Sequence, residues 1–275
     1  MTARVELERN QALLAWYGSR RRDLPWRGTS DAYRILVAEV MLQQTQASRV
    51  VPYYLRFLEQ FPTAESLATA PLGEVLDCWS GLGYNTRAVR LRETARIVTA
   101  EGWPRDIGAL QDLPGIGPYT AAAMASFAFG AKVPAVDTNL RRVLSRWHGE
   151  PLDGPLLMTV AAATLADDAG SWNQAMMDLG ATVCRPRNPT CDDCPVEAWC
   201  AGPDGYVPAF PQARFEGSAR HLRGAIVRAV VREPHTFEDL RRETGFGTTE
   251  IEMALEDLVT EGLVAETETG YTVGE

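Results

Sequence analysis

Apolar residues recur at helical spacing through most of the first 200 residues. The spacing is clear in EVLDCWSGLG (74–83), GALQDLPGIGPYTAAAMASFAFG (108–130) and PLLMTVAAATLADD (155–168), where Gly and Pro interrupt it. No segment before residue 201 shows the alternation of apolar and polar positions that is typical of a half-buried strand. The pattern therefore predicts an all-α structure for residues 1–200.

The pattern changes after a Gly- and Pro-rich linker at residues 201–217. Three short helices are predicted next, followed by two short strands around a turn at Thr269–Gly270. The sequences of these elements are ARHLRGAIVRAVVRE, TFEDLRRETG and TTEIEMALEDLVTEG for the helices and LVAETETGYTV for the strands. Three helices and a hairpin in so short a segment predict a winged-helix-like tail at residues 218–275.

One carboxylate interrupts the apolar stretch VAEVMLQQTQ at residues 37–46. On a helix, three of the four residues one turn away from Glu39 are apolar. Because a buried carboxylate without partners is costly, the position of Glu39 indicates a functional role.

The net charge of −9 argues at first against a nucleic-acid partner. However, residues 201–275 hold 14 acidic and 7 basic side chains, whereas residues 1–200 hold 22 and 20. The first 200 residues could therefore still form a locally basic surface. The charged N-terminus and the absence of long apolar runs predict a cytoplasmic protein without a membrane segment.

Four of the five cysteines are close together, with the spacing Cys184-x6-Cys191-x2-Cys194-x5-Cys200. In an intracellular protein such a group indicates a metal site, either a four-iron, four-sulfur cluster or zinc. Only one close pair is present, which favours the iron–sulfur cluster over zinc.

Two further motifs suggest DNA chemistry, and each also has a purely structural explanation. In LPGIGPYT, Gly115 and Gly117 are expected to allow close backbone approach and positive φ, in a turn whose amide groups hold a phosphate. An ordinary corner between two helices is the alternative. In VPAVDTNLRRV, Asp137 precedes a helix predicted to begin at Thr138 or Asn139, and could simply be its N-cap.

Together these motifs resemble the helix-hairpin-helix DNA glycosylases of the endonuclease III branch. The segments AEVMLQQTQ, LPWR, GLGY and WNQAMMDLGATVC narrow the resemblance to the MutY-like adenine DNA glycosylases. Six separated motifs agree in order between about residues 8 and 200. The resemblance implies a six-helix barrel with the helix-hairpin-helix (29–132) and an iron–sulfur domain (1–28 and 133–200). It also implies a [4Fe-4S] cluster on the four cysteines, and a monomer that acts on double-stranded DNA containing an adenine mispair.

The resemblance also implies catalytic roles. Glu39 would protonate adenine N7 as a general acid, which is typically worth about 10²–10⁴-fold in rate. Asp137 would stabilise the positive charge that develops on the sugar, and Asn139 would be an active-site amide beside it. Tyr119 takes the position of the lysine with which bifunctional relatives nick DNA, so hydrolysis without strand cleavage is expected.

Substrate and DNA contacts follow from the same resemblance. The adenine pocket would be lined or supported by Arg22, Trp26, Arg27 and Gln174. Gln44 would enter the base stack and Tyr84 would act as a wedge, offsetting the few kcal/mol that base flipping costs. The other expected DNA contacts are Gln43, Thr45, Leu82, Gly115, Gly117, Arg185 and Arg187.

The tail departs from the family pattern, because full-length MutY-like enzymes usually end in a Nudix-like domain that recognises 8-oxoguanine. The third tail helix is acidic, and no Lys or Arg follows residue 245. We therefore expect the tail to contact a protein partner and to add little to DNA affinity. Two alternatives to an adenine glycosylase stay open: a glycosylase for thymine or uracil opposite guanine, and a non-enzymatic DNA-binding iron–sulfur protein.

Overall fold

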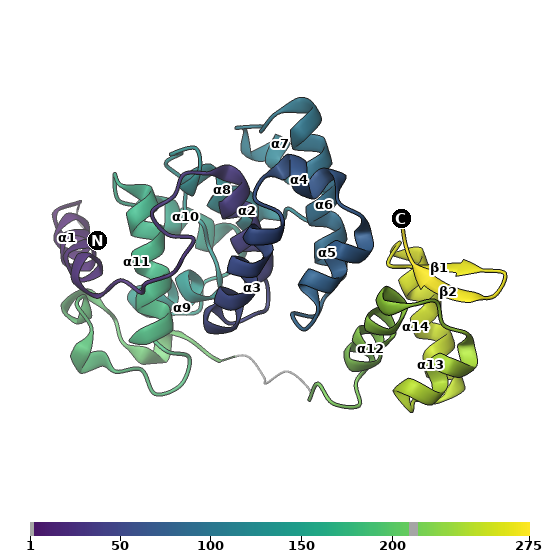
Figure 1. Ribbon diagram of the computed structural model, residues 1–275. Coiled ribbons are helices and arrows are strands. Elements are labelled where there is room, and N and C mark those ends of the chain that lie inside the picture. The colour runs from purple at the N-terminus through teal and green to yellow at the C-terminus, as the bar shows by residue number, and fades with distance from the viewer. Residues whose placement is uncertain (1–2, 209–213) are drawn as a thin grey trace. The chain divides into compact units, whose positions relative to one another are not determined.

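The computed structural model describes residues 3–208 and 214–275 (Figure 1). The chain divides into two compact units, which are described separately below. Unit 1 comprises Met1–Ile35, Arg105–Gln111 and Ile116–Pro211, and unit 2 comprises Leu36–Pro104, Asp112–Gly115 and Gln212–Glu275. The predicted division into an iron–sulfur domain, a barrel with the hairpin, and a separate tail remains a prediction.

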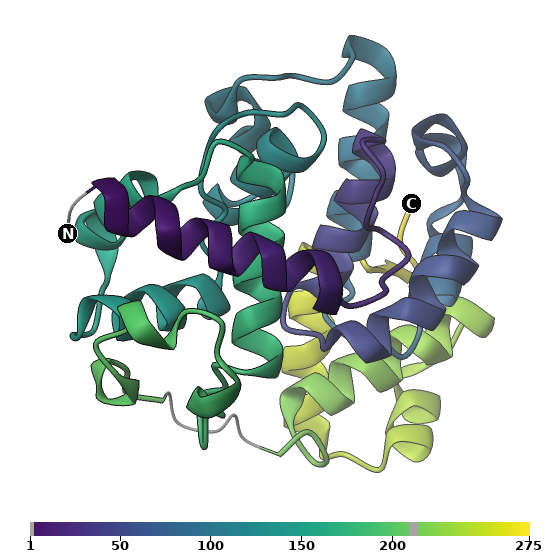
Figure 2. The ribbon, with the colours of Figure 1, turned by 90° about the vertical axis from the view of Figure 1, so that its left-hand side faces the viewer.

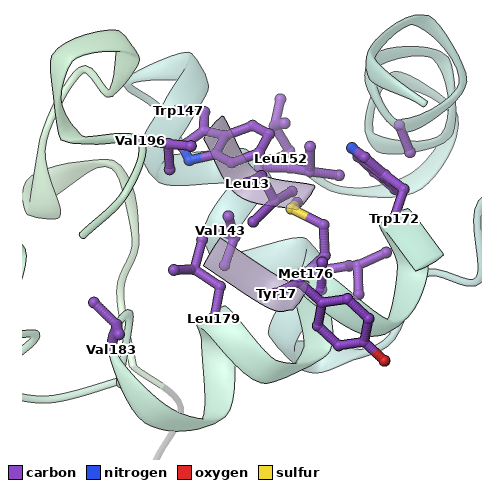
Figure 3. Close-up of a cluster of buried hydrophobic side chains, with 14 of the residues drawn as sticks. Leu13, Tyr17, Val143, Trp147, Leu152, Trp172, Met176, Leu179, Val183 and Val196 are labelled. Carbon is purple, nitrogen blue, oxygen red and sulfur yellow. The ribbon is translucent and has the colours of Figure 1, made fainter. Parts of the chain in front are cut away.

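Unit 1 is helical. Its helices are α1 (Ala3–Arg20), α7 (Ile107–Gln111), α8 (Pro118–Phe127), α9 (Thr138–His148), α10 (Gly154–Thr164) and α11 (Ala169–Thr182). Figure 2 shows α1 lying across α11, which also packs against α9. The side chains of Leu13, Val143, Trp147, Trp172 and Met176 fill the space between these helices (Figure 3).

Local signals fix the ends of the two helices on which the site depends. Asp137 and Asp168 are the N-caps of α9 and α11, and α9 ends at Gly149, whose φ of 93° suits glycine. The start of α9 at Thr138 confirms the sequence prediction. A Cβ at Gly180 would lie 2.6 Å from Asn139 Cβ, so glycine is needed where α11 crosses α9.

Unit 2 consists of two helical groups and the only strands among residues 3–208 and 214–275. The first group continues α2 (Ala32–Leu42), which begins in unit 1, and adds α3 (Ala47–Gln60), α4 (Ala64–Thr69), α5 (Leu72–Trp79) and α6 (Thr86–Glu101). Its core includes Phe57, packed against Phe61 and edge-on against Trp79. The all-α prediction for the first 200 residues is confirmed over their described part.

The tail contains the predicted three helices and hairpin. Its elements are α12 (Ala219–Arg232), α13 (Phe237–Thr244), α14 (Thr248–Thr260), β1 (Val264–Thr267) and β2 (Gly270–Val273). The prediction of a turn at Thr269–Gly270 was wrong by one residue, because Thr267 pairs with Gly270 and leaves Glu268–Thr269 as the turn. Gly270 belongs to the strand, where a Cβ would lie 2.3 Å from the carbonyl oxygen of His235.

Candidate functional site

The Asp137 carboxylate is held in one orientation at the start of α9. Its Oδ1 accepts a 2.7 Å hydrogen bond from the Leu140 amide, and its Oδ2 accepts another of 2.7 Å from the Asn139 side chain. Burial raises the pKa of Asp137, and these hydrogen bonds partly oppose that rise. Asp137 is therefore the helix N-cap that the simpler interpretation predicted, and it is also an oriented carboxylate in a largely desolvated position.

Asn139 is itself fixed by Arg142, a buried residue that the sequence analysis did not single out. Arg142 Nη2 donates to Asn139 Oδ1 over 2.7 Å and to the carbonyl of Gly180 over 2.6 Å. Its Nε donates to the carbonyl of Cys184 over 2.7 Å. A continuous chain of hydrogen bonds thus connects Asp137 to the backbone of the first clustered cysteine.

Tyr119 lies on the first turn of α8 and is partly buried. Its ring packs on a small core formed by Ala122, Ala123 and Ala135, which Phe127 and Val133 also cover. Lys132, the only lysine of the chain, pairs instead with Asp167 over 2.6 Å at the surface.

Arg22 and Arg27, predicted at the substrate pocket, both bind Asp178 of α11. Arg27 donates two hydrogen bonds of 2.5 and 2.7 Å to the carboxylate, and Arg22 donates through its side chain at 2.6 Å and its backbone at 3.0 Å. Burial alone would raise the pKa of Asp178, but these hydrogen bonds and charges hold it below its ordinary value. Asp178 is fully buried and was missed, although it lies within the quoted segment WNQAMMDLGATVC.

Gln174, one turn before Asp178 on α11, accepts a 2.5 Å hydrogen bond from the Tyr17 hydroxyl. The Arg27 guanidinium lies 5.6 Å from the centre of the Tyr17 ring. Trp26 is 8% exposed and belongs to the hydrophobic core. The predicted pocket residues Arg27 and Gln174 are therefore brought together through Tyr17 and α11, with Arg22 joining through Asp178.

The four clustered cysteines line one cavity of about 290 Å³ in unit 1. Burial raises the pKa of Cys194 to about 12 and raises the pKa of Cys191 and Cys200 as well. In the part of the chain that the structure describes, no group of His, Cys, Asp or Glu side chains is arranged to hold a single metal ion.

Arg146 connects both ends of the cysteine segment. Its guanidinium donates to Cys184 Sγ over 3.2 Å, to the carbonyl of Arg185 over 2.8 Å and to the carbonyl of Pro203 over 3.1 Å. The side chains of Arg185 and Arg187 are exposed, as a contact with an external phosphate requires.

Glu39 lies in unit 2, in the part of α2 that is otherwise apolar. It is 5% exposed, and the flanking residues Leu36, Ala38 and Val40 are buried with it. The burial that the sequence pattern predicted for this carboxylate is confirmed.

Two turns of unit 2 carry most of the predicted DNA contacts. Gln44 and Tyr84 have φ of 55° and 51°, values that non-glycine residues rarely adopt, so each marks a constrained turn. Tyr84 is 37% exposed and Leu82 is 6% exposed. Thr45 Oγ1 donates to the carbonyl of Gln43 over 3.3 Å.

Arg87, which the sequence analysis also missed, joins these two turns. Its Nη1 donates to the carbonyls of Val40 and Gln43, each over 2.7 Å, and its Nη2 donates to the carbonyl of Gly83 over 3.0 Å. Burial lowers the pKa of Arg87 to about 10. This guanidinium fixes the positions of Gln44 and Tyr84 without displaying its charge to solvent.

The predicted hairpin turn agrees with the structure at one of its two glycines. Gly115 has φ of 77°, and a Cβ there would lie 3.0 Å from Arg90 Cβ, so positive φ and close approach are both confirmed. Gly117 has φ of −85° and ψ of 178°, so the expected positive φ was wrong. The cause is Pro118, because the residue before a proline is restricted to extended backbone. Gln43 Nε2 donates to the carbonyl of Gly115 over 3.5 Å.

Among the described residues, no helix combines the length and apolar character needed to span a membrane. The chain resembles known proteins over most of its length. Residues 37–157 match the family model of the HhH-GPD superfamily base excision DNA repair proteins.

An adenine DNA glycosylase of Mycolicibacterium smegmatis is 42% identical over 94% of this chain and 93% of its own length. The adenine DNA glycosylase of Homo sapiens is 45% identical over 69% of this chain and 38% of its own length. The solved structure of a thermostable thymine-DNA glycosylase is 32% identical, with a TM-score of 0.68 over 73% of this chain and 97% of that chain.

Proposed function

The chain belongs to the adenine DNA glycosylases of the HhH-GPD superfamily, enzymes of base excision repair that hydrolyse N-glycosyl bonds, and we propose that its substrate is adenine paired with 8-oxoguanine or guanine. We further propose that it leaves the abasic strand intact. The observation that carries the proposal is the oriented carboxylate of Asp137 at the start of α9.

Asp137 would stabilise the sugar as the glycosidic bond breaks. A carboxylate fixed by two hydrogen bonds needs no rearrangement when positive charge develops beside it, and burial strengthens that interaction. The Asn139 amide supports the ionised form of Asp137, because it donates a hydrogen bond to it.

Glu39 would supply the proton that makes adenine a better leaving group. Its exposed fraction of 5% keeps bulk water from competing for the proton, and its position on α2 fixes the carboxyl on a rigid element. The proton would pass from the Glu39 carboxyl to adenine N7. A water molecule would then complete hydrolysis at the sugar carbon.

The absence of strand cleavage would follow from Tyr119. A lyase step needs an amine that forms a Schiff base with the opened sugar, and a phenol cannot form one. Lys132, paired with Asp167, lies outside the hairpin motif. Adenine release without nicking is therefore the expected product pattern.

The cysteine cavity suits a [4Fe-4S] cluster, for which four thiolates are the usual ligands. Cys184, Cys191, Cys194 and Cys200 would hold it. Arg146 would offset part of the negative charge beside Cys184. The bound cluster would cross-link the segment between residues 184 and 200 and so fix its exposed arginines, Arg185 and Arg187.

The two turns of unit 2 would hold the DNA open around the extruded base. Gln44, with an exposed side chain, would fill the gap in the stack, and Tyr84 would wedge beside the partner base. Thr45 and Leu82 flank these positions and would contact that base.

One panel of duplexes tests the substrate. Adenine, thymine or uracil is placed opposite guanine or 8-oxoguanine, and base release is followed with enzyme in excess. We expect release of adenine in both contexts and none of thymine or uracil. Release of thymine opposite guanine would favour the activity named for the structural neighbour. Binding without any release would favour a non-enzymatic DNA-binding protein.

Two variants test the residue roles. Glu39→Gln and Asp137→Asn should each abolish adenine release while leaving duplex binding largely intact, because both carboxylates would act on charge that arises in the transition state. Near-native release by either variant would refute the corresponding assignment.

A further inference from the structure

A groove of about 1040 Å³ lies within unit 2 between α12 of the tail and two turns. The turns are Gln43–Gln46, which follows α2, and Gly81–Asn85, which follows α5. The groove therefore joins the predicted base-contacting residues Gln44 and Tyr84 to a helix that the sequence analysis left without a DNA-binding role.

The groove is basic although the chain is acidic. Six arginines besides the buried Arg87, and three carboxylates, line it, whereas the net charge of the whole chain is −9. Two of the three carboxylates, Asp257 and Glu261, pair with Arg223, whose positive charge offsets part of their negative charge. Within residues 3–208 and 214–275, Arg49, Arg90 and Arg228 form no ion pair with a carboxylate.

The helix α12 makes a direct contact with the constrained turn. Arg220 Nη1 donates to the Tyr84 hydroxyl over 3.1 Å, and the Arg87 guanidinium lies 5.4 Å from the centre of the Tyr84 ring. Thr86 Oγ1 also donates to Glu261 of the tail over 2.7 Å. These contacts place the arginines of α12 beside the side chain that would face the partner base.

The acidity of the tail is concentrated away from this face. Glu250, Glu252 and Glu256 of α14 do not line the groove, and the two tail carboxylates that do line it, Asp257 and Glu261, are held by Arg223. The net charge of the tail therefore does not describe the local charge at the groove, and binding to phosphate depends on the charges nearest to the phosphate.

We propose that α12 is a DNA-binding element in which Arg220 and Arg228 contact phosphates of the strand whose bases meet Gln44 and Tyr84. The proposal rests on the proposed function, because that function supplies the duplex. It replaces the expectation that the tail adds little to DNA affinity. Phosphodiester backbone is the favoured occupant because the same groove presents the side-chain amides of Gln43 and Gln44 together with Arg49 and Arg90, which form no ion pair within the described residues.

The test compares two double variants of the full chain that change the net charge equally. Arg220→Gln/Arg228→Gln alters the groove. Arg241→Gln/Arg242→Gln alters two exposed arginines of α13 that do not line the groove, and serves as the matched control. Binding is measured by fluorescence anisotropy over a series of salt concentrations, on a duplex that carries a stable abasic analogue opposite guanine.

The groove variant should lose about tenfold in affinity at low salt. The slope of log Kd against log salt concentration should fall by about one for each phosphate contact removed, and so by about two for this double variant. The control variant should match the unmodified protein in both respects. Equal affinities and equal salt slopes for all three proteins would overturn the proposal, and would leave the groove to a protein partner.

Two controls keep the result interpretable. Melting temperatures show whether either variant is folded, and the single variant Arg228→Gln tests phosphate contact without removing the Arg220 hydrogen bond to Tyr84. For Arg228→Gln, a decrease of about one in the slope of log Kd against log salt concentration supports the proposal by itself. Adenine release by the unmodified protein is measured separately, so a failure of the proposed function is distinguishable from a failure of this one.

Discussion

The side-chain amide of Asn139 donates a 2.7 Å hydrogen bond to Asp137 Oδ2 while its carbonyl oxygen accepts one of 2.7 Å from Arg142. Asn139 can therefore present only its NH₂ group to Asp137. A donor fixed in this way favours the ionised carboxylate, in opposition to the burial that raises the pKa of Asp137.

Replacing Asn139 with Ala should slow adenine release by about 10- to 100-fold, as expected for the loss of a hydrogen bond to a charged group worth roughly 1–3 kcal/mol. Because the pKa of Asp137 is already raised, activity should fall as the pH is lowered through a value above 3.8. In Asn139→Ala this acid limb should move to still higher pH. Single-turnover rates across the acidic range measure both effects.

The Asp137 carboxyl should affect folding stability in the opposite direction to activity as the pH changes. A carboxyl whose folded-state pKa is raised contributes most to folding below its unfolded pKa, and that contribution is lost as the pH rises through the folded pKa. An unchanged acid limb in Asn139→Ala would show that Asn139 does not support the ionised form of Asp137.

Arg27→Ala should destabilise the protein by about 3–5 kcal/mol, because it leaves the fully buried carboxylate of Asp178 with only Arg22 as a charged partner. Urea unfolding at neutral pH measures the change in the free energy of unfolding. The exposed pair Lys132–Asp167 provides the control, and Asp167→Asn should give no measurable change.

The effect of Arg27→Ala should depend on pH. Since the folded-state pKa of Asp178 is lowered, its stabilising contribution is present above the unfolded pKa, near 3.8, and is lost as the pH falls through the folded value. The difference between the variant and the unmodified protein should shrink in that acidic range. A difference that is constant with pH would indicate lost packing instead of a lost ion pair.

Features encoded within a few residues of each other were predictable from the sequence. The start of α9 at Thr138 follows from the capping preference of Asp137, and the helices of the tail follow from their apolar spacing. The extended backbone of Gly117 could also have been predicted, since Pro118 follows it.

Partners distant in the sequence were not predictable in the same way. Asp178 lies about 150 residues from Arg22 and Arg27, and no periodicity connects them. Arg87 and Arg142 bind mainly backbone carbonyls, which every residue carries, so no pattern of side chains marks their targets. The basic groove could not be predicted from net charge, because the net charge of the tail sums the basic α12 and the acidic α14.

The cysteine site makes a prediction about iron. Purified protein should be brown and contain about four irons per chain, as ligation of a [4Fe-4S] cluster by four thiolates requires. Cys194→Ser should lower the iron content and the visible absorbance, since Cys194 lines the cavity. Cys78→Ala is the matched control, because Cys78 is buried in unit 2 outside that cavity, and it should keep its iron. One equivalent of zinc without iron in anaerobically prepared protein would refute the cluster.

The position of Tyr119 makes a prediction about strand nicking. Borohydride should trap little covalent complex between the unmodified protein and DNA containing an abasic site, because Schiff-base formation needs an amine nucleophile. Tyr119→Lys should raise the trapped fraction, since the first turn of α8 would then carry an amine.

Lys132→Ala is the control for the Tyr119→Lys experiment, because Lys132 is the only lysine of the native sequence and forms an ion pair with Asp167 at the surface. The trapped fraction should stay low in Lys132→Ala, and the double variant Tyr119→Lys/Lys132→Ala should trap as much DNA as Tyr119→Lys. Efficient trapping by the unmodified protein that disappears in Lys132→Ala would identify Lys132 as the nucleophile. Efficient trapping that persists in Lys132→Ala would point to an amine other than a lysine side chain, and either result would contradict the proposal that this enzyme releases adenine without nicking.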